Sequence, residues 1–186
     1  MLALRDGHAE EAAPREREDF SELAASIAGD EVTVYCWSGE GWGAFAGQYA
    51  TVRGNEEISL KGLADTAGNR IDLEPGVCTA LRGYVRRYRP PALSFENFQL
   101  AEALVVLSHH AKHVESPSTP EVDVECYAVQ QVRPYIRAAG WEPGYQTELA
   151  LQAWELGYTQ LPPQARTPDC RNGGPLDENP DSDAWP

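Results

Sequence analysis

Three histidines stand close together near the middle of the sequence, and an acidic segment follows them. His109 and His113 are four residues apart, so on a helix they present two imidazoles on one face. Glu121, at the start of the next helical pattern, is the natural third ligand. A His2Glu set leaves a fourth tetrahedral position open, which is the arrangement of catalytic zinc sites. The spacing therefore predicts a Zn²⁺ site formed by His109, His113 and Glu121.

The residue after the first histidine decides what such a site could do. In the zinc-peptidase motif His-Glu-x-x-His, the glutamate takes a proton from the water that the metal activates. This sequence has His110 at that catalytic position. Because a positioned general base contributes about 10²- to 10⁴-fold to the rate, we predict a metal site with little turnover. His110 and His113 are also three residues apart, so His110 is an alternative ligand.

Other polar residues near this segment have supporting roles in the same interpretation. Glu125 lies one turn after Glu121 and could accept the second N–H of a liganding histidine, which would fix its orientation. Tyr127 and Tyr135 are candidate oxyanion donors if they face the site, although aromatic residues on an amphipathic helix are more often part of the core.

A purely structural explanation of the same residues remains open. Histidines near the C-terminus of a helix complement its dipole, and acidic residues near the N-terminus of the next helix do the same there.

The elements that must position these residues are helices joined by short breaks. Apolar residues at helical spacing predict a helix at 16–28 and, after Pro75-Gly76, a bundle of about four more. The expected bundle helices cover about 77–88, 94–113, 121–139 and 145–158, and Pro134 should kink or shorten the third. The break at 116–120 lets two antiparallel helices bring Glu121 opposite His109 and His113.

A small sheet is expected before the bundle. Extended patterns at 32–37, 57–60 and 70–73 predict about three strands, with a turn at 38–43. The connections look too short for crossovers, so the sheet should be antiparallel. The fold class is therefore α+β. The expected organisation is a flexible lead at 1–15, one metallopeptidase-like domain at 16–161, and an irregular tail at 162–186 packed on the domain.

Composition excludes some classes of partner. The chain has 186 residues and a formal net charge of −14, which argues against a nucleic-acid surface and disfavours an anionic membrane surface. The arginines of 82–89 fall at the end of an expected helix, where positive charge suits the helix dipole. No apolar run reaches the roughly 18 residues of a spanning helix. Residues 1–19 contain no apolar core of a signal peptide.

The four cysteines are widely separated and contain no Cys-x-x-Cys pair. Two disulfides would allow three pairings, and spacing does not choose between them. Four buried free thiols in a cytosolic protein are the alternative.

Four segments together resemble a family of uncharacterised actinobacterial cell-envelope proteins that are similar to small gluzincin-type zinc metallopeptidases. The segments are LSHHAKH at 107–113, EVDVECYAVQ at 121–130, DCRNGGPLD at 169–177 and AWP at 184–186. The similarity covers about residues 31–186, and only the histidine and glutamate helices are specific to a mechanism. It implies a minimal gluzincin-like fold with His109, His113 and Glu121 as zinc ligands and Glu125 as the supporting acid.

The resemblance also implies export and paired cysteines. It makes Cys36–Cys78 and Cys126–Cys170 the expected disulfides, and it places the protein in the cell envelope or outside the cell. Membrane contact would then come only through an export or anchor segment that this sequence lacks. The chain departs from the family at His110, where the catalytic glutamate belongs.

Three functions follow from these observations. The first is a zinc-binding metallopeptidase-like domain, a possible pseudoenzyme or weak hydrolase, that meets peptides or proteins of the cell envelope and no nucleic acid. The second is a non-enzymatic binding or structural envelope protein that reuses the scaffold. The third is a cytosolic regulator with free thiols.

Overall fold

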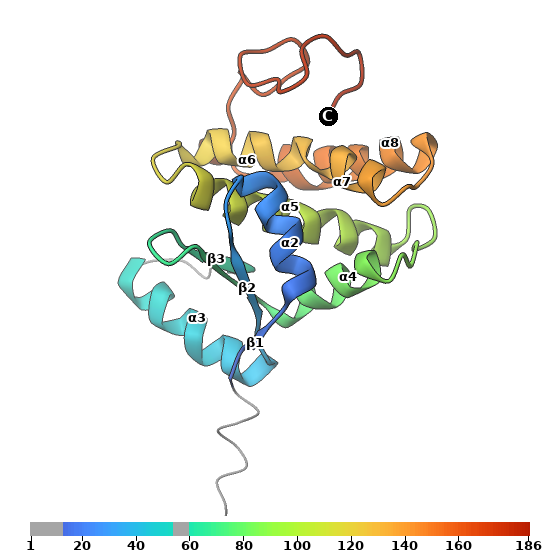
Figure 1. The fold of residues 1–186 in the computed structure, drawn as a ribbon. Helices are drawn as coiled ribbons and strands as arrows, with labels where there is room; N and C mark the ends of the chain where they lie inside the picture. The colour runs from blue at the N-terminus through green and yellow to red at the C-terminus, as the bar shows by residue number, and fades with distance from the viewer. Residues whose placement is uncertain (1–12, 54–59) are drawn as a thin grey trace, which may run out of the picture.

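The structure, a computed structural model, describes residues 13–53 and 60–186 and has a small sheet beside a larger helical layer (Figure 1). The α+β class expected from the sequence is confirmed. The strands are β1 (Arg15–Glu16), β2 (Thr33–Cys36), β3 (Gly62–Asp65) and β4 (Arg70–Leu73). The helices are α2 (Glu18–Ala28), α3 (Gly39–Arg53), α4 (Pro75–Val85), α5 (Phe95–Glu115), α6 (Glu121–Gln130), α7 (Val132–Ala138) and α8 (Pro143–Gln152).

Helix α5 is the central element of the fold. It packs against α2, α4, α6, α8 and β3, and its apolar residues Leu100, Leu104 and Leu107 are almost completely buried. Ser94 caps its N-terminus by accepting a hydrogen bond from the Asn97 backbone N–H at 3.1 Å. The histidines of the sequence motif thus lie on the most heavily packed helix, which holds their backbone in place.

The sheet differs from the expected antiparallel arrangement. Its order is β1-β2-β4-β3, and β2 pairs with β4 in parallel, whereas the β1–β2 and β3–β4 pairs are antiparallel. The expected turn at 38–43 is wrong, because these residues belong largely to helix α3. The chain between β2 and β4, which includes α3 and β3, supplies the long connection that parallel strands require. The strand expected at 57–60 lies mostly outside the described residues, and the strand that pairs with β4 is Gly62–Asp65.

The last two bundle helices differ from their expected bounds. The helix expected at 121–139 is divided into α6 and α7, as anticipated from Pro134, which lies in the first turn of α7, where it is tolerated. The last bundle helix begins earlier than expected, at Pro143, and continues from α8 as a π-helix over Ala153–Gly157. Arg15, placed in the flexible lead by the sequence, instead pairs with Cys36 in β1–β2.

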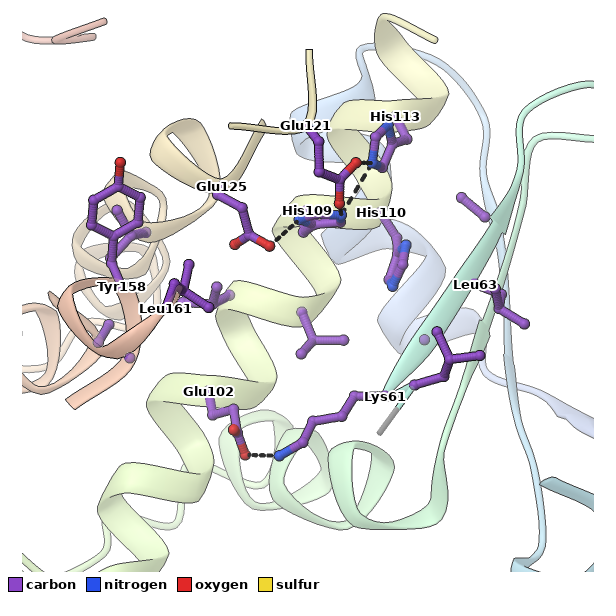
Figure 2. A pocket seen from close by; sticks show the side chains of 18 of the residues that line it. Lys61, Leu63, Glu102, His109, His110, His113, Glu121, Glu125, Tyr158 and Leu161 are labelled. Carbon is purple, nitrogen blue, oxygen red and sulfur yellow. Dashed lines mark hydrogen bonds and ion pairs between the residues drawn. The ribbon is translucent and has the colours of Figure 1, made fainter. Parts of the chain in front are cut away.

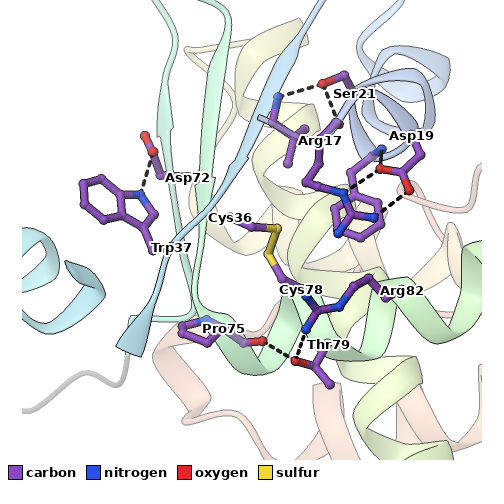
Figure 3. Close-up of a disulfide and its surroundings, with 12 residues drawn as sticks. Arg17, Asp19, Ser21, Cys36, Trp37, Asp72, Pro75, Cys78, Thr79 and Arg82 are labelled. Atoms are coloured by element: carbon purple, nitrogen blue, oxygen red, sulfur yellow. Dashed lines mark hydrogen bonds and ion pairs between the residues drawn. A yellow bond between two sulfur atoms is a disulfide. The ribbon is translucent and has the colours of Figure 1, made fainter. Parts of the chain in front are cut away.

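Both disulfides expected from the resemblance are present, and none of the four cysteines is free. Figure 3 shows Cys36, at the end of β2, joined to Cys78 in the first turns of α4. Cys126 on α6 joins Cys170 in the tail, which forms an irregular cap beside α6–α8 (Figure 1). Two disulfides favour an oxidising compartment and exclude the free-thiol alternative for this structure. Among the described helices, none is long and apolar enough to cross a membrane.

Candidate metal centre

The C-terminal half of α5 and the first turns of α6 bring His109, His113 and Glu121 together (Figure 2). The Nε2 atoms of His109 and His113 are 3.0 Å apart. Each is also close to the Glu121 carboxylate, with 3.2 Å from His109 Nε2 to Oε1 and 3.1 Å from His113 Nε2 to Oε2. The short break between α5 and α6 therefore produces the convergence that the sequence predicts.

These separations fit a tetrahedral metal ion. Zinc bonds of 2.0–2.1 Å to nitrogen and oxygen place neighbouring tetrahedral ligands about 3.3 Å apart. The separation of the two histidine nitrogens is slightly shorter than this value, and each nitrogen contacts a different oxygen of the Glu121 carboxylate. One ligand atom from each residue lies within 4.8 Å of the others, so small movements of the side chains would accommodate the ion. Glu121 is the most exposed member, with 61% of its side chain accessible, which leaves one side of the group open. The three residues could hold a metal ion with a free coordination position.

Glu125 supports the group from one turn further along α6. Its Oε1 lies 3.4 Å from His109 Nδ1, where it can accept the N–H of the ring. That contact leaves Nε2 as the nitrogen that faces Glu121 and His113, which is the tautomer a metal requires. The structure thus places Glu125 where the sequence predicts a supporting acid.

Without a metal, the group carries its own positive charge. Burial alone would lower the pKa of His109, but hydrogen bonds to Glu121 and Glu125 outweigh it and raise the pKa to about 9. Hydrogen bonds from His109 and His113 hold the pKa of Glu121 well below its usual range. A protonated imidazole next to a carboxylate therefore balances the site electrostatically in the metal-free protein.

His110 lies beside the group, on the side of strand β3 (Figure 2). Its ring centroid is 5.0 Å from that of His109 and 6.4 Å from that of His113. The ring packs so closely on Gly62 that a Cβ there would be 2.5 Å from His110 Nε2. Its Nδ1 is buried without a hydrogen-bond partner among the described residues. Burial, followed by the charges of His109 and His113, holds the pKa of His110 well below its usual range.

The three residues His109, His113 and Glu121, called the metal group below because they could hold an ion, open into a cleft of about 830 Å³. Its floor is the face of α5 that carries Glu102, Val105 and Val106, and one wall is formed by Leu63 and its neighbours on β3. The opposite wall comes from 156–162, including Leu161. A volume of this size is typical of ligand-binding clefts, which measure about 300–1,000 Å³.

The two candidate oxyanion donors do not line this cleft. The Tyr135 hydroxyl is directed towards α2, where it donates to the Leu23 carbonyl at 3.3 Å. Tyr127 lies under the Lys112 ammonium, 4.5 Å from its ring centroid, in a separate small pocket. Both therefore have structural roles.

Some residues of the cleft were missed by the sequence analysis. Lys61 and Glu102 form an ion pair of 2.6 Å at the end of the cleft away from the histidines. Glu102 could have been found, because it precedes His109 by seven residues, which is two helical turns on the same face. Lys61 could not, since nothing in its local sequence relates it to α5. Tyr158 also lines the cleft, but the Thr167 backbone N–H donates to its hydroxyl at 3.1 Å.

Comparisons of this chain with protein-family models, with curated proteins and with solved structures found no match.

Proposed function

We propose that this protein is a zinc-binding, metallopeptidase-like domain of the cell envelope whose peptidase activity is weak or lost because His110 occupies the position of the general base. The observation that carries the proposal is the convergence of His109, His113 and Glu121 at separations close to those of tetrahedral ligands. An open zinc site of this type would supply a Lewis acid and a more acidic water.

A peptide is the ligand that the cleft fits best. Strand β3 lies at the end of the strand order, so within the described sheet its outer edge has no partner strand. An extended peptide can add to such an edge through backbone hydrogen bonds. The floor beneath it is apolar at Val105 and Val106 and is charged at both ends, by Glu102 with Lys61 and by the metal group.

The proposed loss of activity follows from the position of His110. Its ring is held against Gly62, and its Nδ1 is enclosed without a partner among the described residues. A glutamate at the same position would place a narrower and more flexible side chain beside the group, with a carboxylate that can act as a base without joining the ligand set. The imidazole is instead bulky and fixed, and it lies outside the group that could hold a metal.

An export compartment agrees with the two disulfides, which persist in oxidising surroundings. The partners in this proposal are peptides or proteins of the envelope.

The test is a side-by-side assay of the native protein and His110→Glu on an unbiased peptide pool, after metal analysis of both preparations. We expect one zinc per chain in each, and His110→Glu should hydrolyse peptides about 10²-fold faster or more. Two alanine variants of neighbouring residues test the ligand assignment. His109→Ala should lose the metal, whereas the matched control His110→Ala should retain it.

Robust, chelator-sensitive cleavage by the native chain would refute the loss of activity. Full metal content in both His109→Ala and His110→Ala would refute the ligand assignment. If both the native protein and His110→Glu bind zinc but neither cleaves peptides, the non-enzymatic binding protein becomes the better explanation.

A further inference from the structure

Exposed apolar side chains gather on the turn between α4 and α5. Seven large hydrophobic residues are exposed among the described ones, and four of them lie within residues 85–95. Val85 is 39% exposed, Tyr88 57%, Leu93 81% and Phe95 70%. In Figure 1 this α4–α5 turn projects from one end of the helical layer. Exposed apolar side chains that cluster in this way are typical of interaction surfaces.

The same turn carries positive charge that is not neutralised. Residues 82–95 contain four arginines and no acidic residue, although the whole chain has a net charge of −14. Arg89 pairs with Glu142, but Arg86 and Arg87 are exposed and form no ion pair with any described residue. The first acidic residue after this range is Glu96. The surface therefore combines apolar side chains with two free guanidinium groups.

The backbone presents these side chains in an unusual conformation. Three non-glycine residues of the described chain have positive φ, and two of them are in this turn, Arg87 at 56° and Leu93 at 54°. A leucine in the left-handed region is strained, and such strain persists where the surrounding structure enforces it. Here Glu148 on α8 enforces it, because its carboxylate accepts hydrogen bonds from the Leu93 backbone N–H at 2.9 Å and from Asn97 Nδ2 at 3.0 Å. The fold thus fixes Leu93 in an outward position.

An anionic lipid surface fits this combination better than a protein groove. Leu93 and Phe95 stand out from the surface, and neither lines the cleft. Projecting apolar side chains can enter the acyl boundary while arginines meet lipid phosphates. This contact departs from the expectations drawn from the sequence, in which the net charge disfavoured an anionic membrane and membrane contact was confined to an export or anchor segment. The net negative charge opposes the contact only weakly, because at physiological ionic strength charges beyond about 8 Å are screened.

We propose that the α4–α5 turn docks the protein on an anionic membrane surface, with Leu93 and Phe95 as apolar anchors and Arg86 and Arg87 as phosphate contacts. This surface lies about 20 Å along α5 from His109, given a rise of 1.5 Å per residue. Docking would hold the cleft at a set distance from the lipid and does not involve the metal group.

The test is co-sedimentation of the full chain with vesicles of phosphatidylcholine containing phosphatidylglycerol, and with vesicles of phosphatidylcholine alone. We expect binding to the anionic vesicles that weakens as salt is added. Leu93→Asn should lower the partition coefficient about tenfold or more, and Arg87→Asn about fivefold. Asparagine tolerates positive φ, so neither change should lower the thermal midpoint. Tyr49→Asn, at a tyrosine 45% exposed on α3, should leave binding unchanged.

Absence of binding to anionic vesicles would overturn the proposal. So would equal binding by the native protein, Leu93→Asn and Tyr49→Asn. A loss with Arg87→Asn and none with Leu93→Asn would indicate a purely ionic contact, such as an acidic partner protein, and would also overturn it.

Discussion

At the scale of single residues, the carboxylates around His109 favour a positive charge at its imidazole. In the metal-free protein a proton supplies that charge. Glu121 and Glu125 approach the two nitrogens of one imidazole, at 3.2 Å and 3.4 Å. Two carboxylates around one buried ring favour its charged form, which explains why its pKa rises to about 9 although burial opposes this. A metal ion that binds Nε2 must displace that proton.

Metal affinity should therefore depend on pH in a defined direction. Below a pKa of about 9 His109 is protonated, so metal binding releases a proton and the apparent affinity should rise about tenfold per pH unit from pH 6 to 8 and level off above about 9. Titration with zinc at several pH values, in buffers of different ionisation enthalpy, measures both the slope and the proton release. An affinity that does not change with pH would contradict the protonated metal-free state.

The same shift affects the stability of the metal-free protein. The raised pKa of His109 contributes stability that is complete below its unfolded value of about 6.5 and is lost as the pH rises through about 9.

At the scale of elements, the contact between α5 and β3 determines where His110 can be. Gly62 is in the strand that faces α5, and the absence of a side chain there makes room for the imidazole. Leu73 Cδ2 would also be close to a Cβ at this position, at 3.2 Å. The glycine and the histidine are therefore a matched pair across two elements.

This pairing predicts a coupled effect of two substitutions. Gly62→Ala should lower the free energy of unfolding by about 1–3 kcal/mol, because its Cβ would meet His110 Nε2 at 2.5 Å. In a His110→Ala background the cost should shrink, since the clashing ring is absent. Denaturant unfolding of the four proteins of this cycle measures the coupling. Gly43→Ala, in helix α3 with nothing within 4 Å of the new Cβ, is the control and should be neutral or stabilising. Equal costs of Gly62→Ala in both backgrounds would show that the two residues are independent.

At the scale of the whole molecule, the tail is part of the fold. Cys126–Cys170 joins it to α6, and the Gln130 side chain clamps it further. Gln130 Nε2 donates to the Leu176 carbonyl at 2.9 Å, and Gln130 Oε1 accepts from the Glu178 backbone N–H at 2.9 Å. Arg133 donates to the Pro186 carbonyl at 3.0 Å. The tail is thus held on α6, which also carries Glu121 and Glu125, and on α7.

Removal of the second disulfide should loosen this tail. Replacing Cys126 and Cys170 by alanine should lower the free energy of unfolding by about 2–5 kcal/mol, because the bridge closes a loop of 44 residues. Amide hydrogen exchange should then accelerate in 171–186. The matched control replaces Cys36 and Cys78, which are 42 residues apart, and should destabilise similarly while the tail stays protected. Unchanged exchange in the tail after loss of Cys126–Cys170 would show that the hydrogen bonds alone hold it.

The sequence by itself determined the features that depend on local spacing. Helical periodicity set the α+β class and most helices, and Ser94 marked the start of α5. His109 and His113 are four residues apart, and a break of five residues follows their helix. A short loop favours an antiparallel arrangement of the two helices that it joins, and this arrangement brings Glu121 and Glu125 next to the histidines. The disulfide pairing came from the resemblance and not from spacing.

Only the tertiary structure decided the features that depend on contacts between distant segments. The glycines of 38–43 predicted a turn, yet they lie in helix α3, and the connection that contains α3 and β3 allows β2 and β4 to pair in parallel. The ion pair of Lys61 with Glu102, the fit of His110 on Gly62 and the outward positions of Leu93 and Phe95 arise from packing around α5. A local pattern cannot encode them, because each depends on where another segment lies, and burial against that segment outweighs the intrinsic preference of the residues themselves.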